Sequence, residues 1–346
     1  MTLVRQYHED PYHRSYYWEN NLFDLTPVEE VLGINFKRED KFAPLGYGNI
    51  NGSKARQCLH LMNRWVEASP SMEGVVSGSV VGSPQHPFIS SMCKHFNKRC
   101  VIFVGAKNYL EHNYARHAYR LGAEINVSKI GYAKALQKKC VDFKREEQKR
   151  GNHWKMLELN ITVLAKHGFK KIEAFHRIGA EQVRNIPDDI ETLIVPSGSC
   201  NSVVSILYGI SLYPQKSLKN IILMGIGNNG SKNLGYIPER LKAISLQTGK
   251  SVNQYFDYSE LSNNNLLGSF VGKKGRYKIK RYDLNGTGYC KYETLMPFTY
   301  GDIVFHPRYE GKIMNYIHEN MDEIKKYWNR KTLFWIVGGQ VSDTLA

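Results

Sequence analysis

The stretch NINGSKARQ (residues 49–57) joins a turn to a helix and places one lysine at the junction. Positions 49–53 are mostly small and polar, which is typical of a turn, and residues 55–66 carry a helical pattern. Lys54 therefore stands at a helix N-terminus, where the helix dipole disfavours a cation and helps to lower the lysine pKa. A neutral lysine amine attacks aldehydes to form a Schiff base, so Lys54 is a candidate for covalent catalysis; the alternative is a solvated surface lysine.

Short apolar runs alternate with amphipathic stretches on the C-terminal side of this lysine. Strands are predicted within residues 74–82, 99–105, 191–199, 220–227 and 332–339. Helices are predicted from Pro87, through Tyr119, from Cys200 and from Pro238, and two more within residues 132–167, broken near Gly151 and Asn152. Buried strands that end in Gly-rich turns before helices are typical of parallel α/β folds, whose ligands bind beyond the carboxyl ends of the strands.

Composition limits the class of protein. The chain has 346 residues, of which 42% are hydrophobic, enough for one large or two medium globular domains. It has no run of 18 apolar residues and no signal peptide, so we expect a soluble, cytoplasmic protein. Six cysteines without a CxxC pair predict free thiols, and 12 histidines without close ligand spacing predict no metal site.

Two loops could bind polar groups of a ligand. Residues 195–202 (VPSGSCNS) join a predicted strand to a helix, and their small residues let backbone N–H groups and hydroxyls approach a phosphate; an ordinary Ser-rich helix cap is the alternative. The loop lacks the GKS or GKT ending of a nucleoside-triphosphate loop. Residues 79–86 (SVVGSPQH) could offer hydroxyl and amide groups to a carboxylate or phenolate, although turn chemistry explains the same residues.

Several short motifs together resemble a known family. They are KRED (residues 37–40), GNINGSKAR (48–56), SPQ (83–85), SGSCNS (197–202), GTGY (286–289), HPRYEGK (306–312) and FWIVGG (334–339). Their order and approximate spacing resemble those of the 1-aminocyclopropane-1-carboxylate deaminase and D-cysteine desulfhydrase family, over residues 32–340. The resemblance implies pyridoxal 5'-phosphate (PLP) as cofactor and a homodimer.

The same resemblance implies a fold and its domains. The fold is the α/β PLP-dependent fold type II, in which two doubly wound parallel-sheet domains hold the cofactor in the cleft between them. Residues 31–57 and 170–346 would form the large PLP-binding domain and residues 58–169 the small one. Residues 1–30 would form an N-terminal extension.

The resemblance also implies roles for individual residues. Lys54 matches the lysine that bonds the cofactor aldehyde, and Glu310 matches a carboxylate that keeps the pyridine nitrogen protonated; a surface carboxylate at a helix start is the alternative for Glu310. Tyr309 and Tyr289 match active-site tyrosines, and Ser83 and Gln85 match positions facing the substrate carboxylate and the cofactor edge. The phosphate cradle would consist of Ser197, Gly198, Ser199, Cys200, Asn201 and Ser202.

This sequence departs from the family pattern at two positions. Pro84 replaces an asparagine usual beside the cofactor phenolate, and His306 replaces an aspartate usual before Pro307. Both changes indicate an altered reaction specificity.

The chain is strongly basic, with a formal net charge of +15, and one segment is especially so. In KKGRYKIKR (residues 273–281) basic residues alternate with Tyr277 and Ile279, which suits a strand or ribbon with a basic, partly aromatic face. The candidate nucleic-acid contacts are Lys273, Lys274, Arg276, Lys278, Lys280 and Arg281. A solvated hairpin is the alternative.

Three functions compete at this point. The leading hypothesis is a PLP-dependent lyase that decarboxylates an amino-acid-modified thymidine in DNA, because bacterial viruses encode enzymes similar to this fold with that activity. The second is a deaminase or desulfhydrase of a small free amino acid, with an incidental basic surface. The third is a non-catalytic nucleic-acid-binding protein that retains a degenerate enzyme fold; the presence of Lys54, Tyr309 and Glu310 disfavours it.

Overall fold

The computed structural model describes residues 21–45, 50–158, 172–226, 234–261, 275–284 and 294–338. The chain forms two compact units. Of the described residues, the first unit holds 21–22, 42–45 and 50–158. The second unit holds residues 23–41 and the described residues from 172 to 338.

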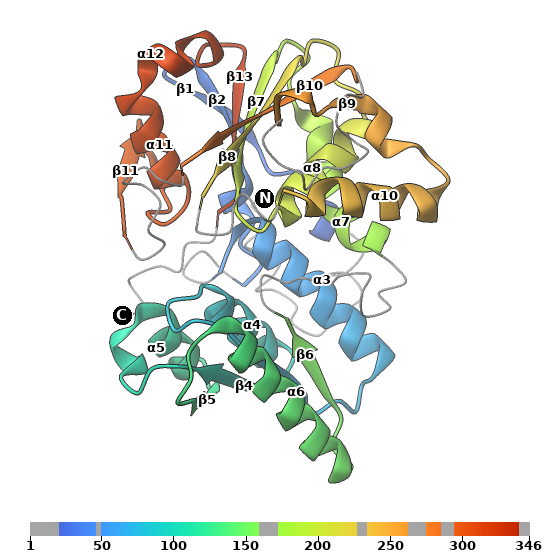
Figure 1. Ribbon diagram of the computed structural model, residues 1–346, viewed down its shortest axis with the longest axis vertical. Coiled ribbons are helices and arrows are strands. Elements are labelled where there is room, and N and C mark those ends of the chain that lie inside the picture. The colour runs from blue at the N-terminus through green and yellow to red at the C-terminus, as the bar shows by residue number, and fades with distance from the viewer. Residues whose placement is uncertain are drawn as a thin grey trace. The chain divides into compact units, whose positions relative to one another are not determined.

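The second unit is built on a seven-stranded sheet in the order β1-β2-β13-β7-β8-β10-β9. β1 runs antiparallel to β2, and every other neighbouring pair is parallel. Figure 1 shows β13, β7, β8 and β10 side by side. The strands are β1 (Val28–Val31), β2 (Ile34–Arg38), β7 (Thr192–Ser197), β8 (Asn220–Gly225), β9 (Phe256–Asp257), β10 (Tyr277–Asp283) and β13 (Thr332–Ile336).

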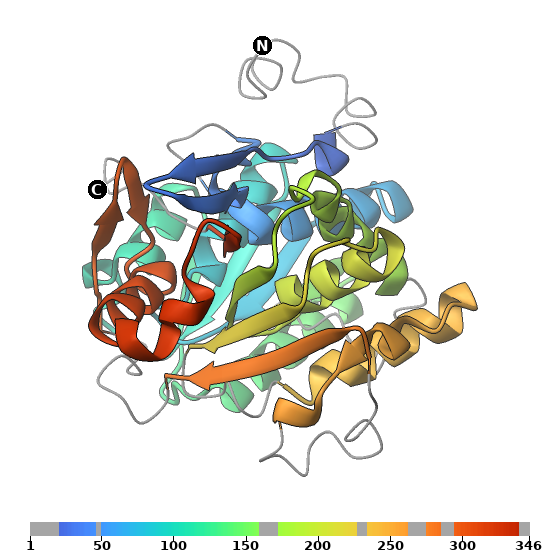
Figure 2. The same cartoon turned by 90° about the horizontal axis from the view of Figure 1, so that it is seen from above.

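Each face of this sheet has its own hydrophobic core, because successive strand residues point to opposite faces. Leu193 and Ile221 pack with α7, α8 and α10, whereas Ile194 and Ile222 pack with α11 and α12. Figures 1 and 2 show the two groups of helices on opposite sides of the sheet. The helices are α7 (Ile172–Ala180), α8 (Asn201–Leu212), α10 (Tyr236–Thr248), α11 (Glu310–Glu319) and α12 (Met321–Ile324).

The first unit contains a four-stranded parallel sheet in the order β5-β4-β3-β6. Cys140 of α6 packs on one of its faces with Val76, Val101 and Trp154. The strands are β3 (Gly74–Gly78), β4 (Arg99–Val104), β5 (Glu124–Val127) and β6 (Trp154–Leu157). The helices are α3 (Gly52–Ala68), α4 (Gln85–His95), α5 (Asn113–Arg120) and α6 (Ala133–Lys149).

Short elements complete the two units. A separate antiparallel pair consists of β11 (Phe298–Tyr300) and β12 (Ile303–Phe305). Turns of 3-10 helix occupy Asn21–Phe23, Glu39–Lys41, Tyr109–Glu111, Glu181–Asn185, Val252–Tyr255, Ser259–Leu261 and Lys325–Tyr327. Within the described ranges, no helix has both the length and the apolar character needed to cross a bilayer.

The predicted parallel strands and the helices that follow them are present, but the region 132–167 differs from expectation. α6 ends at Lys149, and the chain then forms the strand β6 in the first part of the predicted second helix; residues 159–167, where that helix was predicted to continue, lie outside the described residues. β6 pairs with β3, which buries Trp154 with its ring 4.9 Å from that of Phe143. The pairing of a buried aromatic residue in the sheet outweighs the local helical pattern.

The boundaries of the units also differ from those expected from the sequence. Residues 23–30 belong to the second unit, because β1 pairs along β2 and extends its sheet. Residues 52–57 belong to the first unit, because they are the start of the uninterrupted helix α3.

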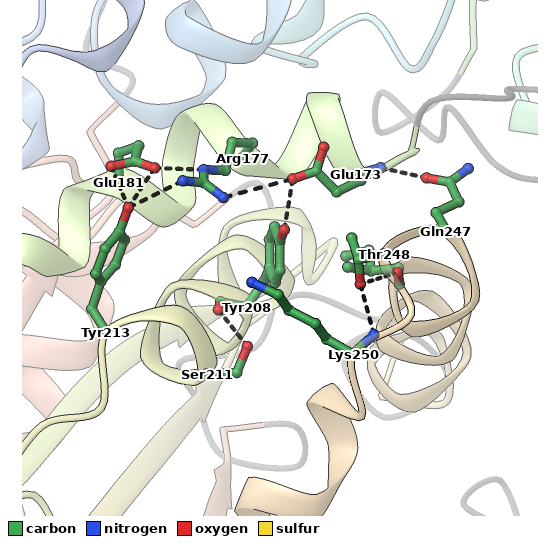
Figure 3. A network of polar contacts seen from close by, with 10 residues as sticks. Glu173, Arg177, Glu181, Tyr208, Ser211, Tyr213, Gln247, Thr248 and Lys250 are labelled. Carbon is green, nitrogen blue, oxygen red and sulfur yellow. Dashed lines mark hydrogen bonds and ion pairs between the residues drawn. The ribbon is translucent and has the colours of Figure 1, made fainter.

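A polar network ties α7 to α8 and to the 3-10 turn Glu181–Asn185 (Figure 3). Arg177 forms ion pairs with Glu181 and, at 4.0 Å, with Glu173. The Tyr208 hydroxyl donates to Glu173 over 2.6 Å, and the Tyr213 hydroxyl donates to Glu181 over 2.8 Å. Arg184 also forms an ion pair with Glu181, at 3.6 Å. Since the Glu181 side chain is only 8% exposed, these three partners stabilise a charge that water solvates poorly.

We expect Glu181→Ala to lower the free energy of unfolding by about 1–3 kcal/mol, because it leaves a guanidinium and a hydroxyl without their acceptor. Urea denaturation monitored by circular dichroism measures this loss. Glu146→Ala is the matched control: its pair with Lys149 is more than half exposed, so its loss should change the free energy of unfolding much less. Equal losses in the two variants would contradict a stabilising role for the network.

Candidate functional site

The loop SGSCNS lies at the carboxyl end of β7, between that strand and α8. β7 ends at Ser197 and α8 begins at Asn201. Cys200 adopts a left-handed backbone conformation with a φ of 62°, which turns the chain into the helix. The Cys200 side chain, at the N-cap of α8, makes no capping hydrogen bond. The first backbone N–H groups of a helix point toward its N-terminus, which here is the loop. A helix start of this kind, next to small residues, suits a phosphate group.

Two buried arginines lie close to this loop. Arg240, on α10, donates a hydrogen bond to the Asn201 side chain. Arg281, on β10, lies against Gly225 at the end of β8, where an added Cβ would come within 2.7 Å of the guanidinium. Burial raises the pKa of the Cys200 thiol, and the charges of Arg240 and Arg281 oppose that rise. The loop therefore has positive charge beside it although its own sequence contains none.

Glu310 is a fully buried carboxylate at the start of α11. Its Oε1 accepts hydrogen bonds from the backbone N–H groups of Val337 at 2.8 Å and Gly338 at 3.1 Å. Its Oε2 has no hydrogen-bond partner among the residues that the structure describes. Burial raises the pKa of Glu310 to about 8; the backbone hydrogen bonds oppose this rise and the charge of Asp40 adds to it. One oxygen is thus fixed and the other is available to a buried donor.

The backbone before α11 brings Tyr309 beside His306. Their rings are 4.8 Å apart, and the carbonyl oxygen of His306 accepts a hydrogen bond from Gly311 N–H at 2.9 Å. A Cβ at position 311 would lie 2.2 Å from the Met296 carbonyl oxygen, so this approach requires glycine. His306, where the resembled family has aspartate, accepts a hydrogen bond from the backbone of Arg308 at 3.1 Å.

Lys54 lies in the first turn of α3, in the first unit, and is partly buried. Burial lowers its pKa, and the nearby Cys58 opposes this effect. Burial likewise raises the pKa of Cys58 to about 12, which keeps that thiol protonated. A lowered lysine pKa increases the fraction of neutral amine, as nucleophilic attack requires.

Ser83 and Gln85 flank Pro84, the N-cap of α4, and Gln85 is the first residue of that helix. The Ser83 hydroxyl accepts a hydrogen bond from Gln85 N–H at 3.3 Å. The Gln85 amide donates to Ser77 Oγ and to the Glu158 carbonyl oxygen, both at 2.9 Å. These two hydrogen bonds from the Gln85 side-chain amide therefore hold the turn at the start of α4 against the ends of β3 and β6.

The KRED motif has an architectural role in the second unit. Lys37 is fully buried, and its ammonium donates to the Thr26 carbonyl oxygen at 2.7 Å and to Asn185 Oδ1 at 2.6 Å. Arg38 pairs with Asp40 at 2.8 Å and also with Glu29. These contacts fix the end of β2 next to the segment that carries Asp40.

The basic segment forms β10 and differs from the exposed basic face that its composition indicated. Tyr277 and Ile279 are fully buried between β8 and β9. Lys280 pairs with Glu260 at 2.7 Å, and Arg281 is 8% exposed and pairs with Asp283 at 3.0 Å. A strand inside a parallel sheet must bury one side of itself, so the charges are divided between interior and surface. Lys278 is the exposed basic residue of the strand.

Arg276, just before β10, donates to the carbonyl oxygens of Gln215 and Lys216. Lys273, Lys274 and Tyr289 lie outside the described residues. Across the described ranges, no group of three or more His, Cys, Asp or Glu side chains is arranged to hold a metal ion. Arg240 was not predicted, because it is one of 47 basic residues and no motif surrounds it.

Comparisons with known proteins place these features in context. No family model matches the chain. An O-seryl-dTMP PLP-dependent decarboxylase of Salmonella phage ViI is 35% identical over 366 aligned positions, covering 94% of this chain and 84% of that protein.

Solved structures show the fold. An ACC deaminase homologue aligns with a TM-score of 0.65 at 16% identity, over 93% of each chain. Threonine deaminase isoform 2 from Solanum lycopersicum aligns with a TM-score of 0.54 at 15% identity, over 92% of this chain and 85% of that one. The predicted fold type II is confirmed by these neighbours, and the phage relative covers nearly the whole sequence. The chain therefore belongs to the family of the phage O-seryl-dTMP PLP-dependent decarboxylase.

Proposed function

We propose that this protein is a PLP-dependent lyase that decarboxylates an amino acid attached to a thymine nucleotide. The phage relative is a decarboxylase described as acting on O-seryl-dTMP, which supports this reaction class and this substrate class. We further propose that the protein acts in the cytoplasm of an infected host cell as a homodimer.

The observation that carries the proposal is Glu310 Oε2, a buried oxygen that has no hydrogen-bond partner among the residues that the structure describes. A buried carboxylate with one unpartnered oxygen is costly unless a donor meets it, and a protonated pyridine nitrogen is such a donor. PLP, when bound, withdraws electrons from the α-carbon of an attached amino acid. A carboxylate beside the ring nitrogen favours its protonated form, so Glu310 would strengthen that withdrawal.

The remaining site residues are proposed to bind the phosphate and the aldehyde of the cofactor and the substrate. The N-terminus of α8 and the loop Ser197–Ser202 would hold the phosphate through backbone N–H groups and hydroxyls. Lys54 would bond the cofactor aldehyde through its amine, whose pKa is lowered by burial. Tyr309 and Tyr289 are proposed at the substrate, with Ser83 and Gln85 at its carboxylate and at the cofactor edge.

Decarboxylation requires one proton to be placed on the substrate. When the bond between the α-carbon and the carboxylate breaks, carbon dioxide leaves and its electron pair remains at the α-carbon. A proton must then reach that carbon, and Lys54 is the proposed donor. Its lowered pKa suits proton transfer near neutral pH, because transfer is most efficient when the pKa lies near the working pH.

The fold likeness to deaminases does not favour a free amino acid as substrate. At 16% identity the ACC deaminase homologue shares the fold, and a shared fold carries many different reactions. Deamination or desulfhydration is therefore an outcome that the substrate experiment distinguishes.

We propose nucleic-acid contacts for the exposed part of the basic segment. Lys278 is exposed, and Arg276 precedes the strand on which it lies. Lys273 and Lys274 are proposed with them from the sequence alone. Lys280 and Arg281 are engaged in ion pairs, so their contribution to a polyanion surface would be smaller.

The substrate experiment incubates PLP-loaded protein with three candidates and identifies the products by mass spectrometry. They are the nucleotide O-seryl-dTMP, DNA carrying the same modification, and D-cysteine. We expect loss of carbon dioxide from the nucleotide or the DNA. Faster turnover of the DNA than of the nucleotide would support the proposed contacts between the basic residues and the nucleic acid. Ammonia release from D-cysteine with both thymine substrates intact would contradict the proposal.

We expect Lys54→Ala to abolish multiple turnover and the visible absorbance of lysine-bound cofactor, while the far-UV circular dichroism spectrum stays unchanged. The loss should be at least about 100-fold, because the variant lacks both the covalent amine and the proton donor. Stopped assays with O-seryl-dTMP measure it, and Lys94→Ala on the exposed side of α4 is the control. Undiminished turnover would remove Lys54 from the mechanism.

Glu310 gives a pH dependence with a defined sign. Its pKa in the folded apoprotein is raised to about 8, whereas in the unfolded chain it is that of an ordinary carboxyl. Between the two values the folded state binds more protons, so its stability falls as pH rises from about 5 to about 8. We expect this fall in the melting temperature of the apoprotein, and we expect Glu310→Gln to reduce it.

Addition of PLP should raise the melting temperature of the wild type near the upper end of this pH range, at about pH 8. It should raise the melting temperature of Glu310→Gln by less. Glu319→Gln, an exposed change on the same helix, should behave like the wild type. Identical melting profiles for wild type and Glu310→Gln, with and without PLP, would count against Glu310 as the residue at the ring nitrogen.

A further inference from the structure

Arg240 is a buried cation whose charge is only partly matched in the structure. The residue lies on α10, is 2% exposed, and donates from Nη1 to the Asn201 side chain. Its Nε and Nη2 have no hydrogen-bond partner among the described residues. The Tyr236 ring lies 5.3 Å from the guanidinium carbon and offers a weak cation–π contact. Burial lowers the pKa of Arg240, so the interior destabilises its charge.

Among the described residues, no carboxylate forms an ion pair with Arg240; the exposed Glu239 on the same helix only opposes the fall in its pKa through longer-range electrostatics. Burial keeps the Cys200 thiol protonated by raising its pKa. Burial also lowers the pKa of His176, and the charge of Arg240 adds to this shift, which keeps the imidazole neutral. By contrast, the other arginine near Cys200, Arg281, is paired with Asp283 at 3.0 Å. A buried guanidinium with donors left over costs free energy unless an anion meets it.

The location of Arg240 indicates which anion would bind its remaining donors. Its single described hydrogen bond goes to Asn201, the first residue of α8. At the same helix start the Cys200 side chain makes no capping hydrogen bond, and the Cys200 thiol is close enough to Arg240 for its pKa to respond. Two independent features, a helix N-terminus and a buried cation with unused donors, therefore meet at one point.

We propose that Arg240 is the fixed positive charge that holds the cofactor phosphate as a dianion at the α8 N-terminus. The inference rests on the proposed function, in which PLP occupies this loop. Arg240 acts as a positioning residue: through Asn201 it holds the start of α8, and through its charge it favours the doubly ionised phosphate. It shares no part in bond breaking at the substrate.

The experiment compares two ligands that differ only by the phosphate. Apoprotein is titrated with PLP and with pyridoxal, and binding is followed by absorbance of the lysine-bound aldehyde. The variants are Arg240→Met and Arg240→Gln, which remove the charge, and Arg240→Lys, which keeps it. Lys242→Met removes an exposed charge from the same helix and serves as the control.

We expect the neutral variants to bind PLP about 10- to 100-fold more weakly, the range for losing a hydrogen bond to a charged group. Pyridoxal affinity should stay within about twofold, which also reports that the fold is intact. Arg240→Lys should recover part of the loss, and Lys242→Met should match the wild type. In phosphorus NMR, the bound phosphate should titrate at higher pH in Arg240→Gln than in the wild type, because a nearby cation favours the dianion.

Three outcomes separate the possible failures. If wild-type protein binds neither ligand, the proposed function fails. If wild type binds PLP and Arg240→Gln binds it equally well with an unchanged phosphate titration, the role of Arg240 fails while the proposed function stands. If PLP and pyridoxal lose affinity by the same factor in every Arg240 variant, Arg240 is purely structural and the inference is overturned.

Discussion

The second unit depends on the burial of one carboxylate. An ionised carboxylate in a protein interior costs several kcal/mol unless hydrogen bonds or charges replace its water. Here two backbone N–H groups after β13 meet one oxygen of Glu310, and the other oxygen is left without a partner among the described residues. The contact joins the start of α11 to the end of a central strand, so the helix, the strand and the side chain are positioned together.

Parallel strands bring the other polar groups to the same edge of this sheet, because all their carboxyl ends lie there. β7 ends in the loop before α8, β8 ends at Gly225 beneath Arg281, and β13 ends at the N–H groups that bind Glu310. β2 ends in KRED, whose Lys37 and Arg38 are held by internal partners. KRED, one of the motifs that resemble the family, therefore has a structural role, and its side chains fix the end of β2.

The sequence predicted β3, β4, β7, β8 and β13 and the helices after the first four of them, because each of these strands is a short apolar run bounded by glycine or polar residues. The parallel strands β2, β5 and β9 were not predicted. Glu310 and the loop before α8 were identified through motifs, since spacing alone carries no information on burial. Residues 154–157 were mispredicted because their strand forms only by pairing with β3. The exposure of the basic segment was mispredicted for a related reason, because composition gives the charge of Arg281 but not its burial. Arg240 is buried too, and no motif in the surrounding sequence indicates it.

The order of strands in the large sheet also has a consequence for how the chain folds as it is synthesised. All strands of the smaller sheet come from residues 74–157, so that sheet can close early on the ribosome. β2, however, ends at Arg38 and has β13 as its parallel neighbour, which begins only at Thr332. Until the last strand emerges, the edges of β2 and β7 are left without their shared partner. The nascent protein thus carries a complete small sheet and an incomplete large one, and chaperone binding during synthesis would protect the edges of β2 and β7.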